Sequence, residues 1–195
     1  KLKDFSPGAI VLAGVALGSI FTAGTTIIQF FSDDTSLATA VFWSFGDLNR
    51  IYWNEVLIVT ATVAVCSLFF YAMRWNYNAL SNGTEVAKSL GVSVDKLIGV
   101  GLLLAALIAA MSVSFVGLIG FIGLLGPQIM RRVVGEDYRF LLPGSMLAGA
   151  LILLAADIVA RTIISPIVLP VGAITSILGG PMFLYLLFRG GKTKW

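Results

Sequence analysis

The stretch LIGVGLLLAALIAAMSVSFVGLIGFIGLLGPQIM, residues 97–130, holds 34 residues without a charge and decides how the chain folds. As one α-helix it would be about 51 Å long, against roughly 30 Å for the hydrocarbon core of a bilayer. It is therefore too long for one ordinary membrane span and short for two. Its second half contains residues at which a helix is easily broken: Gly117, Gly120, Gly123, Gly126 and Pro127. We predict a hairpin, with a helix at about 97–115, a turn near Gly117 and a short helix at about 121–134.

The chain as a whole has the composition of a membrane protein. Of its 195 residues 58% are hydrophobic and 12% are charged, whereas a soluble domain carries about 25% charged residues. Four further stretches with few or no charges are long enough for helical spans, at about 8–31, 55–74, 141–165 and 171–188. We therefore predict an all-α, polytopic membrane helical bundle, with residues 1–195 forming a single transmembrane domain of six spans. The short hairpin helix should lie inside this bundle, because a broken helix at membrane depth must be surrounded by protein.

The basic residues indicate the orientation. With six spans and the N-terminus of this segment inside, 11 of the 13 basic residues fall on the cytoplasmic side: Lys1, Lys3, Arg74, Lys88, Lys96, Arg131, Arg132, Arg139, Arg189, Lys192 and Lys194. Only Arg50 and Arg161 fall outside. Cytoplasmic loops carry an excess of Lys and Arg, so this pattern favours cytoplasmic termini for the segment. A single span over 97–130 would place Arg131, Arg132 and Arg139 outside.

The outer connection at 32–54 is longer than a turn. Residues 37–45 within it are apolar and aromatic, which is typical of a short helix that lies on a membrane surface. We expect such a helix, with a plain loop as the alternative.

The cytoplasmic connection at 78–97 has the pattern of a structured segment. Asn82 and Glu85 have the spacing of a capping box, and an apolar pair, Val86 and Leu90, follows at helical spacing. Gly91 suits the end of this helix, and Ser93 can cap the next one. The pattern predicts a short amphipathic helix that either docks on a cytoplasmic partner or rests on the membrane surface.

Asp157 and Arg161 are charged residues within a predicted span. They are four residues apart with the acid first, the favourable order for an ion pair on a helix. Counted from Leu141 at the inner face, Asp157 lies about 24 Å and Arg161 about 30 Å up the helix, near the outer interface. The pair either neutralises itself and fixes the rotation of the helix, or serves a transport pathway or a docking surface. Arg161 has donors to spare for an external carboxylate.

Several chemistries lack their usual residues. The chain has no histidine and one cysteine, Cys66, in an apolar run. It has no phosphate-binding loop, no cluster of metal ligands and no nucleophile–base pair. We therefore expect no catalytic residue, metal site or cofactor, no ATP hydrolysis by this chain itself, and no nucleic-acid partner.

The chain contains six stretches that are typical of one family: LAGVALG (12–18), GTEVAKSLGV (83–92), GFIGL (120–124), RFLLP (139–143), ADIVAR (156–161) and LPVG (169–172). Together they resemble the permeases of type II ABC importers for iron-siderophore, haem and cobalamin. The resemblance covers essentially the whole chain, with the motifs in the order and spacing of the family.

The resemblance implies roles for particular residues. Family permeases have roughly ten spans, of which this chain looks like the last six, with the first and last spans here similar to helices that line the translocation path. Arg161 matches an outer arginine that pairs with an acidic residue of the substrate-binding protein. The segment 83–97 resembles the coupling helices that contact the ATPase, through Glu85, Val86, Lys88, Ser89, Leu90 and Gly91. The cytoplasmic gate of the family falls at Ser6, Pro7 and Gly8. One departure is Gln128 after Pro127, where the family usually has histidine, so that no titrating imidazole is present there.

The residues and the family resemblance together give three hypotheses of function. In the first, the chain is a cell-membrane permease that moves an iron-siderophore, haem or cobalamin-type substrate inward by alternating access. Its expected partners are a second permease subunit, two copies of a cytoplasmic ATPase subunit, an extracellular or periplasmic substrate-binding protein and the lipid bilayer. In the second, it is a secondary transporter that uses Asp157 and Arg161 as an ion-coupling pair. In the third, it is a non-transporting membrane subunit for which 83–97 is a scaffold contact.

Overall fold

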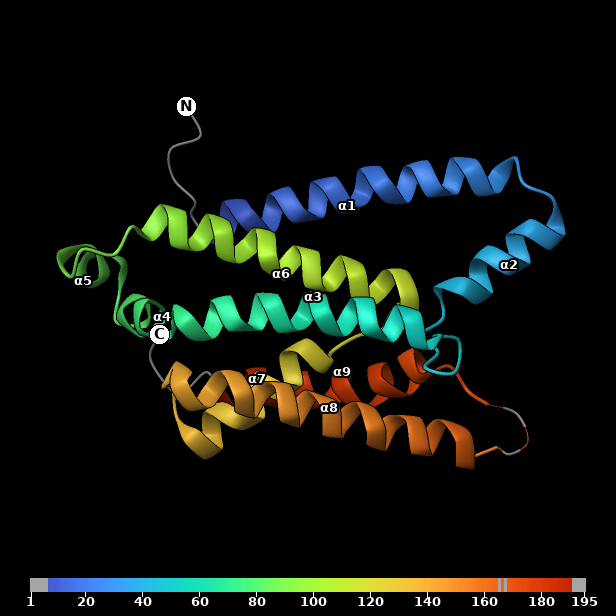
Figure 1. Cartoon of the computed structure of the whole chain (residues 1–195). Coiled ribbons are helices and arrows are strands. Elements are labelled where there is room, and N and C mark those ends of the chain that lie inside the picture. Colours follow the sequence, from blue (N-terminus) through green and yellow to red (C-terminus); the bar gives the residue numbers. More distant parts are fainter. Residues whose placement is uncertain (1–6, 165, 167, 191–195) are drawn as a thin grey trace. The chain divides into compact units, whose positions relative to one another are not determined.

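The computed structural model describes residues 7–164, 166 and 168–190. Over these residues the fold is all-α (Figure 1), with one isolated backbone bridge between Phe45 and Leu118. The helices are α1 (Pro7–Phe30), α2 (Asp34–Ser44), α3 (Trp53–Ala72), α4 (Arg74–Ser81), α5 (Thr84–Ser89), α6 (Val94–Val116), α7 (Ile122–Val134), α8 (Tyr138–Thr162) and α9 (Val171–Gly190).

The chain divides into two compact units, residues 1–43 and residues 44–195. The first contains α1 and most of α2. In α1 the hydroxyl groups donate hydrogen bonds to carbonyl oxygens one turn earlier, as Thr22 does to Gly18 and Thr26 does to Thr22. Such bonds satisfy polar side chains within an apolar helix. The presence of α2 decides the alternative at 37–45 in favour of a helix.

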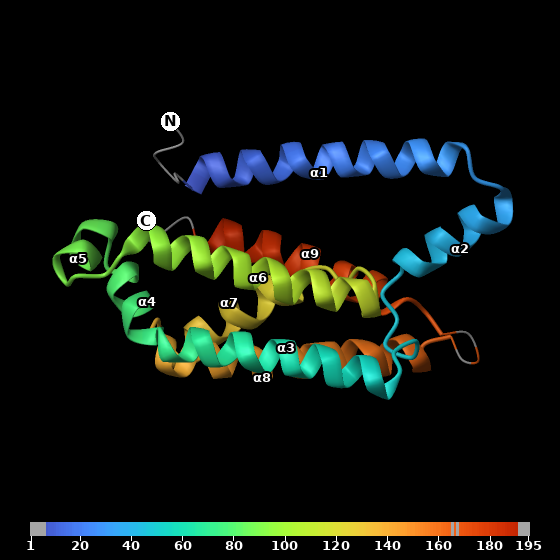
Figure 2. The ribbon, with the colours of Figure 1, turned by 45° about the horizontal axis from the view of Figure 1, so that its top comes forward.

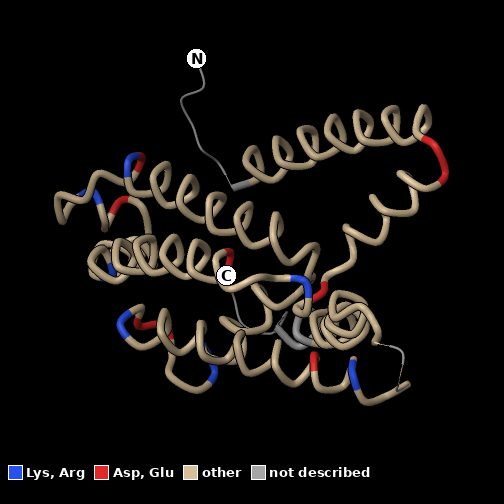
Figure 3. The backbone as a smooth tube through the Cα atoms, turned by 45° about the vertical axis from the view of Figure 1, so that its right-hand side comes forward, with Lys and Arg blue, Asp and Glu red and all other residues tan. Residues whose placement is uncertain are grey.

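Four described helices are long and apolar enough to cross a membrane, over Gly8–Phe30, Trp53–Ala72, Val94–Val116 and Tyr138–Thr162. Lys, Arg, Asp and Glu lie mostly at the helix ends and connections (Figure 3). Helix α7, with 13 residues, and the apolar part of α9, Val171–Tyr185, are shorter. Six membrane crossings therefore stay a prediction.

The long uncharged stretch is broken in its glycine-rich half. Helix α6 ends at Val116, and Gly117 follows with φ +82°. Helix α7 begins at Ile122, after Phe121 in the left-handed conformation with φ +65°. Two helices joined by a five-residue connection thus replace the single 51 Å helix that the stretch could have formed.

Within the second unit, α7 packs most extensively on α8, while α3 packs on α6 and α8 on α9 (Figure 2). Gly126 allows the close approach of α7 to α8, because a Cβ atom there would meet the backbone of Ser145 at 2.9 Å. A small buried cluster joins α8 to the start of α9 and consists of Ala156, Ala160, Val171 and Ile174.

Three separate backbone segments cross at the end of the unit near Val171. The amide of Leu118 donates to the carbonyl of Ser44 at 3.2 Å, and that of Val171 donates to Gly46 at 2.9 Å. A Cβ atom on either Gly46 or Gly172 would collide with the carbonyl oxygen of Leu118. We call residues 44–47, 116–118 and 171–172 the glycine junction. It fixes where α9 begins relative to α6.

Candidate functional site

Helix α5 and the turn that follows it project from the end of the second unit that lies opposite the glycine junction (Figure 1). The side chain of Ala87 is fully buried, whereas Val86 and Leu90 are 45% and 68% exposed. The turn closes when the amide of Val92 donates to the carbonyl of Ala87 at 3.0 Å. Gly91 has φ +80°, a conformation that favours glycine, and it reverses the chain toward α6. The segment therefore presents two large apolar side chains on an otherwise polar connection.

The other predicted residues of this segment lie on α5 or directly after it. Lys88 and Glu85 form an ion pair of 3.1 Å between exposed side chains. The hydroxyl of Ser89 donates to the carbonyl of Val86 at 2.8 Å. Beyond the turn, Val94 and Leu97 are buried at the start of α6. The segment is thus anchored at its base and exposed at its tip.

The predicted capping box at Asn82 and Glu85 is wrong. The residues before it form α4, and Asn82 is the cap at the end of that helix. Its side-chain amide donates back to the carbonyl of Asn78 at 2.8 Å. Gly83, with φ +112°, occupies the N-cap position of α5, which has no side-chain cap. Ser93 does occupy the N-cap position of α6, but without the side-chain hydrogen bond that a cap would form.

Asn78 connects α4 to α8, a contact that the sequence did not predict. Its Nδ2 donates to Oδ1 of Asp137 at 2.8 Å, and its Oδ1 accepts a hydrogen bond of 2.8 Å from the backbone amide of Tyr138. Asp137 is also the N-cap of α8 and accepts from the amide of Arg139. The Asn78 side chain first, and the Arg139 amide second, hold the pKa of Asp137 below its ordinary value.

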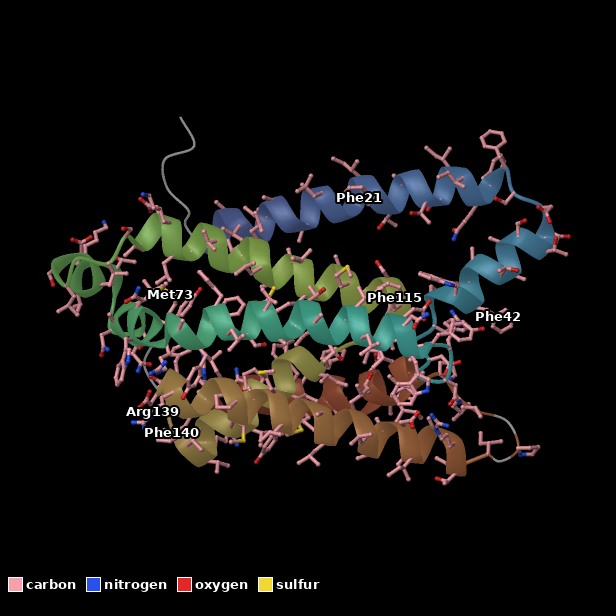
Figure 4. The ribbon with its side chains drawn as sticks, viewed as in Figure 1. Phe21, Phe42, Met73, Phe115, Arg139 and Phe140 are labelled. Atoms are coloured by element: carbon pink, nitrogen blue, oxygen red, sulfur yellow. The ribbon has the colours of Figure 1, made fainter. Side chains whose placement is uncertain are left out.

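Aromatic packing surrounds this contact. The ring of Tyr77 stacks on that of Tyr138, with centroids 5.8 Å apart, and also meets Phe70 of α3. Burial raises the pKa of Tyr77. Figure 4 shows Met73, Arg139 and Phe140 at this end of the second unit and Phe115 at the opposite end. We call Tyr77, Asn78, Asp137 and Tyr138 the α4–α8 joint.

Asp157 and Arg161 form an ion pair on α8. The Nε atom of Arg161 lies 2.8 Å from Oδ2 of Asp157, and their side chains are 41% and 15% exposed, respectively. One face of this helical turn is closed by Ala156 and Ala160 against α9. The guanidinium keeps N–H groups beyond the one that Asp157 occupies, so it can still bind a second carboxylate.

The remaining predicted residues are the gate residues Ser6, Pro7 and Gly8, and Gln128. Ser6 lies outside the described residues, Pro7 begins α1, and Gly8 follows in the same helix. Gln128 is half-buried in α7. Within the described part of the chain, His, Cys, Asp and Glu form no group of three that could hold a metal ion. The α5 segment and the Asp157–Arg161 pair lie toward opposite ends of α8 and do not form one site.

These features define a multi-helical membrane protein with a short helix that projects from one end of its second unit. Comparison with protein families narrows this class of protein, because the FecCD transport family matches residues 1–189 of the chain. The chain belongs to the FecCD transport family.

Two relatives show how much of a longer protein this chain covers. A Methanocaldococcus jannaschii protein, named as an ABC transporter permease, is 53% identical over 189 residues, which cover 97% of this chain and 54% of the relative. The hemin transport system permease protein of Yersinia pestis is 38% identical over 92% of this chain and 54% of its own length. The chain thus spans about half the length of these curated relatives.

A solved structure agrees with the fold. An inward-facing conformation of a transporter described as metal-chelate type ABC is similar to this chain with a TM-score of 0.88 and 32% sequence identity. The match covers 95% of this chain and 62% of that one. Both the sequence and the arrangement of helices therefore relate the chain to ABC transporter permeases.

Proposed function

We propose that the chain is part of the transmembrane permease subunit of an ABC importer and that its 83–97 segment is the contact for a partner ATPase. Membership of the FecCD transport family supports the transport role. In this proposal a second permease subunit completes the pathway, two ATPase subunits drive it from the cytoplasm, and alternating access carries substrate inward. The chain lies in the cell membrane, with both ends of residues 1–195 in the cytoplasm.

The exposed tip of α5 is the observation that carries the ATPase contact. Val86 and Leu90 are solvent-accessible apolar residues, while the ion pair of Lys88 and Glu85 keeps charges beside them. A membrane-surface helix would instead gather its basic residues on one polar face and place a broad apolar face in lipid. The six residues of α5 offer only a narrow apolar edge, which suits insertion into a protein groove better than burial in lipid.

Arg161 is the proposed docking residue for an external binding protein. Its side chain is 41% exposed and shares only its Nε group with Asp157 in the ion pair. An acidic side chain of the binding protein could be bound by the remaining guanidinium donors. Ser6, Pro7 and Gly8 are the proposed cytoplasmic gate.

The proposed substrate is of the iron-siderophore, haem or cobalamin type. Relatives are named for hemin, Fe(3+)-citrate, cobalamin and molybdate import, so similarity alone supports the class of importer more strongly than one substrate.

Co-purification with the partner ATPase tests the proposal directly. The whole protein would be expressed with a candidate partner ATPase subunit, as wild type and as Leu90→Ser. Loss of one apolar anchor at an interface should weaken ATPase binding by roughly tenfold. Gly91→Pro should abolish binding, because proline fixes φ near −65° whereas Gly91 has φ +80°.

The matched control is Ile163→Ser, which removes a similarly exposed apolar side chain, 61% against 68% for Leu90, beyond the other end of α8. It should leave ATPase binding unchanged. Equal retention of the ATPase by wild type and Leu90→Ser would refute the contact at α5. Absence of any ATPase from the purified wild type, together with uptake that does not need ATP, would refute the importer role as a whole.

The same preparation separates the importer from a gradient-driven transporter. In liposomes with ATP inside, collapse of the proton and sodium gradients should leave importer uptake intact. Uptake that stops on collapse of the gradient would favour Asp157 and Arg161 as an ion-coupling pair. Uptake that is unaffected by removal of the α5 tip, in a complex that dissociates, would favour a scaffold role for the segment.

A further inference from the structure

The α4–α8 joint ties the α5 segment to a helix that runs to the Asp157–Arg161 pair. Asn78 uses both atoms of its side-chain amide on α8, donating to Asp137 and accepting from Tyr138, at 2.8 Å each. The two partners lie 59 and 60 residues away in the sequence. Because donor and acceptor are both used, the side chain has one orientation in which the joint is complete.

Little flexible chain separates this joint from the α5 tip. Helix α4 ends at Ser81, and α5 begins at Thr84. The intervening residues are held by hydrogen bonds, from Asn82 to the carbonyl of Asn78 and from the amide of Gly83 to the carbonyl of Leu80 at 3.0 Å. A displacement of α5 should therefore carry α4 with it.

Helix α8 extends from the joint to the far end of the second unit. Its 25 residues, Tyr138–Thr162, correspond to a rise of about 36 Å. Asp137 caps its first turn, and Arg161 with Asp157 lies in its last turns. The helix thus has the joint at one end and the exposed guanidinium at the other.

We propose that Asn78 and Asp137 are positioning residues that transmit movement between the ATPase contact at α5 and the docking residue Arg161 through α8. This inference rests on the proposed function. Binding at Arg161 and nucleotide-driven movement at α5 would each bias the position of the same helix, as a coupling between two distant sites requires. The hydrogen-bonded amide makes the connection geometrically specific, and the Tyr77–Tyr138 stack limits sliding.

An exchange of the two side chains gives a sharp test. In Asn78→Asp two carboxylates face each other, which breaks the contact by repulsion and removes the donor. In the double variant Asn78→Asp with Asp137→Asn, the new carboxylate accepts from the Tyr138 amide and from the new Asn amide. The new Asn oxygen still accepts from the Arg139 amide. The double variant therefore keeps a donor and an acceptor for each hydrogen bond of the joint, with the charge on the opposite residue. The amide at position 137 must turn to serve both partners, because Asn78 and the Arg139 amide share Oδ1 of Asp137 in the wild type.

The measurement is the ratio of ATP hydrolysis with and without the binding protein, in the whole transporter reconstituted in liposomes. Asn78→Asp should reduce this stimulation roughly tenfold, as expected when the Asn78–Asp137 hydrogen bond is replaced by repulsion between two carboxylates, with basal hydrolysis and ATPase co-purification retained. The double variant should recover most of the stimulation. Asp137→Asn alone should have a smaller effect, because a neutral carbonyl oxygen can still accept from Asn78.

Unchanged stimulation in Asn78→Asp would overturn the proposal, as would a double variant no better than the single one. If Asn78→Asp loses the ATPase and the stimulation in parallel, and the double variant restores both together, the joint is a folding contact only and transmission is refuted. Failure of the proposed function is separate, since the wild type itself would then bind no ATPase or show no stimulation.

Discussion

The two ends of the second unit are held together by different chemistry. At the α4–α8 joint, side chains make the contacts: an amide, a carboxylate and two stacked rings. At the glycine junction, backbone groups bond directly to one another, and Gly46 and Gly172 provide the room. A side-chain contact can adjust by small torsional changes, whereas a backbone crossing with no space for a Cβ atom cannot. We therefore expect the packing at the glycine junction to tolerate smaller displacements than the packing at the α4–α8 joint.

The largest effect on stability is expected at the glycine junction. Gly172→Ala places a Cβ atom against the carbonyl oxygen of Leu118, so backbone must shift, and we expect a destabilisation of about 1–3 kcal/mol. Gly180→Ala in the same helix is the matched control, because a Cβ atom there meets nothing within 4 Å. Thermal unfolding in detergent, followed by tryptophan fluorescence, compares the two. Equal melting temperatures would mean that the junction is not rigid.

A pH-dependent effect on stability is expected at the joint. The pKa of Asp137 is lowered by Asn78 and by the Arg139 amide, so the carboxylate stabilises the fold above about pH 3.9, the ordinary aspartate pKa. That contribution is lost as the pH falls through the lower pKa of the folded state. Between pH 5 and 3 the wild type should therefore lose more melting temperature than Asp137→Asn. Parallel curves for the two proteins would show that this carboxylate does not stabilise the joint.

The smallest effect on stability is expected at the Asp157–Arg161 pair. It lies at the glycine-junction end, where backbone contacts already fix the packing, and Arg161 is 41% exposed. Asp157→Asn should cost under about 1 kcal/mol and should leave stimulation by the binding protein intact, since Arg161 is retained. Arg161→Gln should abolish the stimulation at similar stability. Loss of stimulation in both variants would instead assign the function to the pair as a unit.

Local patterns in the sequence account for much of the fold. Uncharged stretches locate the long helices, and the glycines after Val116 coincide with the break before α7. The spacing of Asp157 and Arg161 places them one turn apart, and the structure pairs them at 2.8 Å. Each of these features depends on residues within a few positions of one another, where helix geometry is sufficient.

The errors and omissions involve competition between elements or distant contacts. Asn82 has the spacing of an N-cap, but α4 extends to Ser81, and the side chain instead bonds to the end of that helix. Asn78 and Asp137 are 59 residues apart, and no periodic pattern relates them. The available signals were an asparagine among aromatic residues after α3 and an aspartate three residues before a long apolar run. Neither signal identifies the other residue as its partner.

The small buried core has a calorimetric consequence. Among the described residues the fully packed apolar side chains are few, and many large ones point outward, including Phe21, Leu103 and Leu151. In lipid or detergent those outward groups stay covered by hydrocarbon whether or not the helices remain associated. Since the heat capacity of unfolding arises from apolar surface newly exposed to water, scanning calorimetry of the protein in detergent should show a small heat-capacity step beneath its unfolding transition.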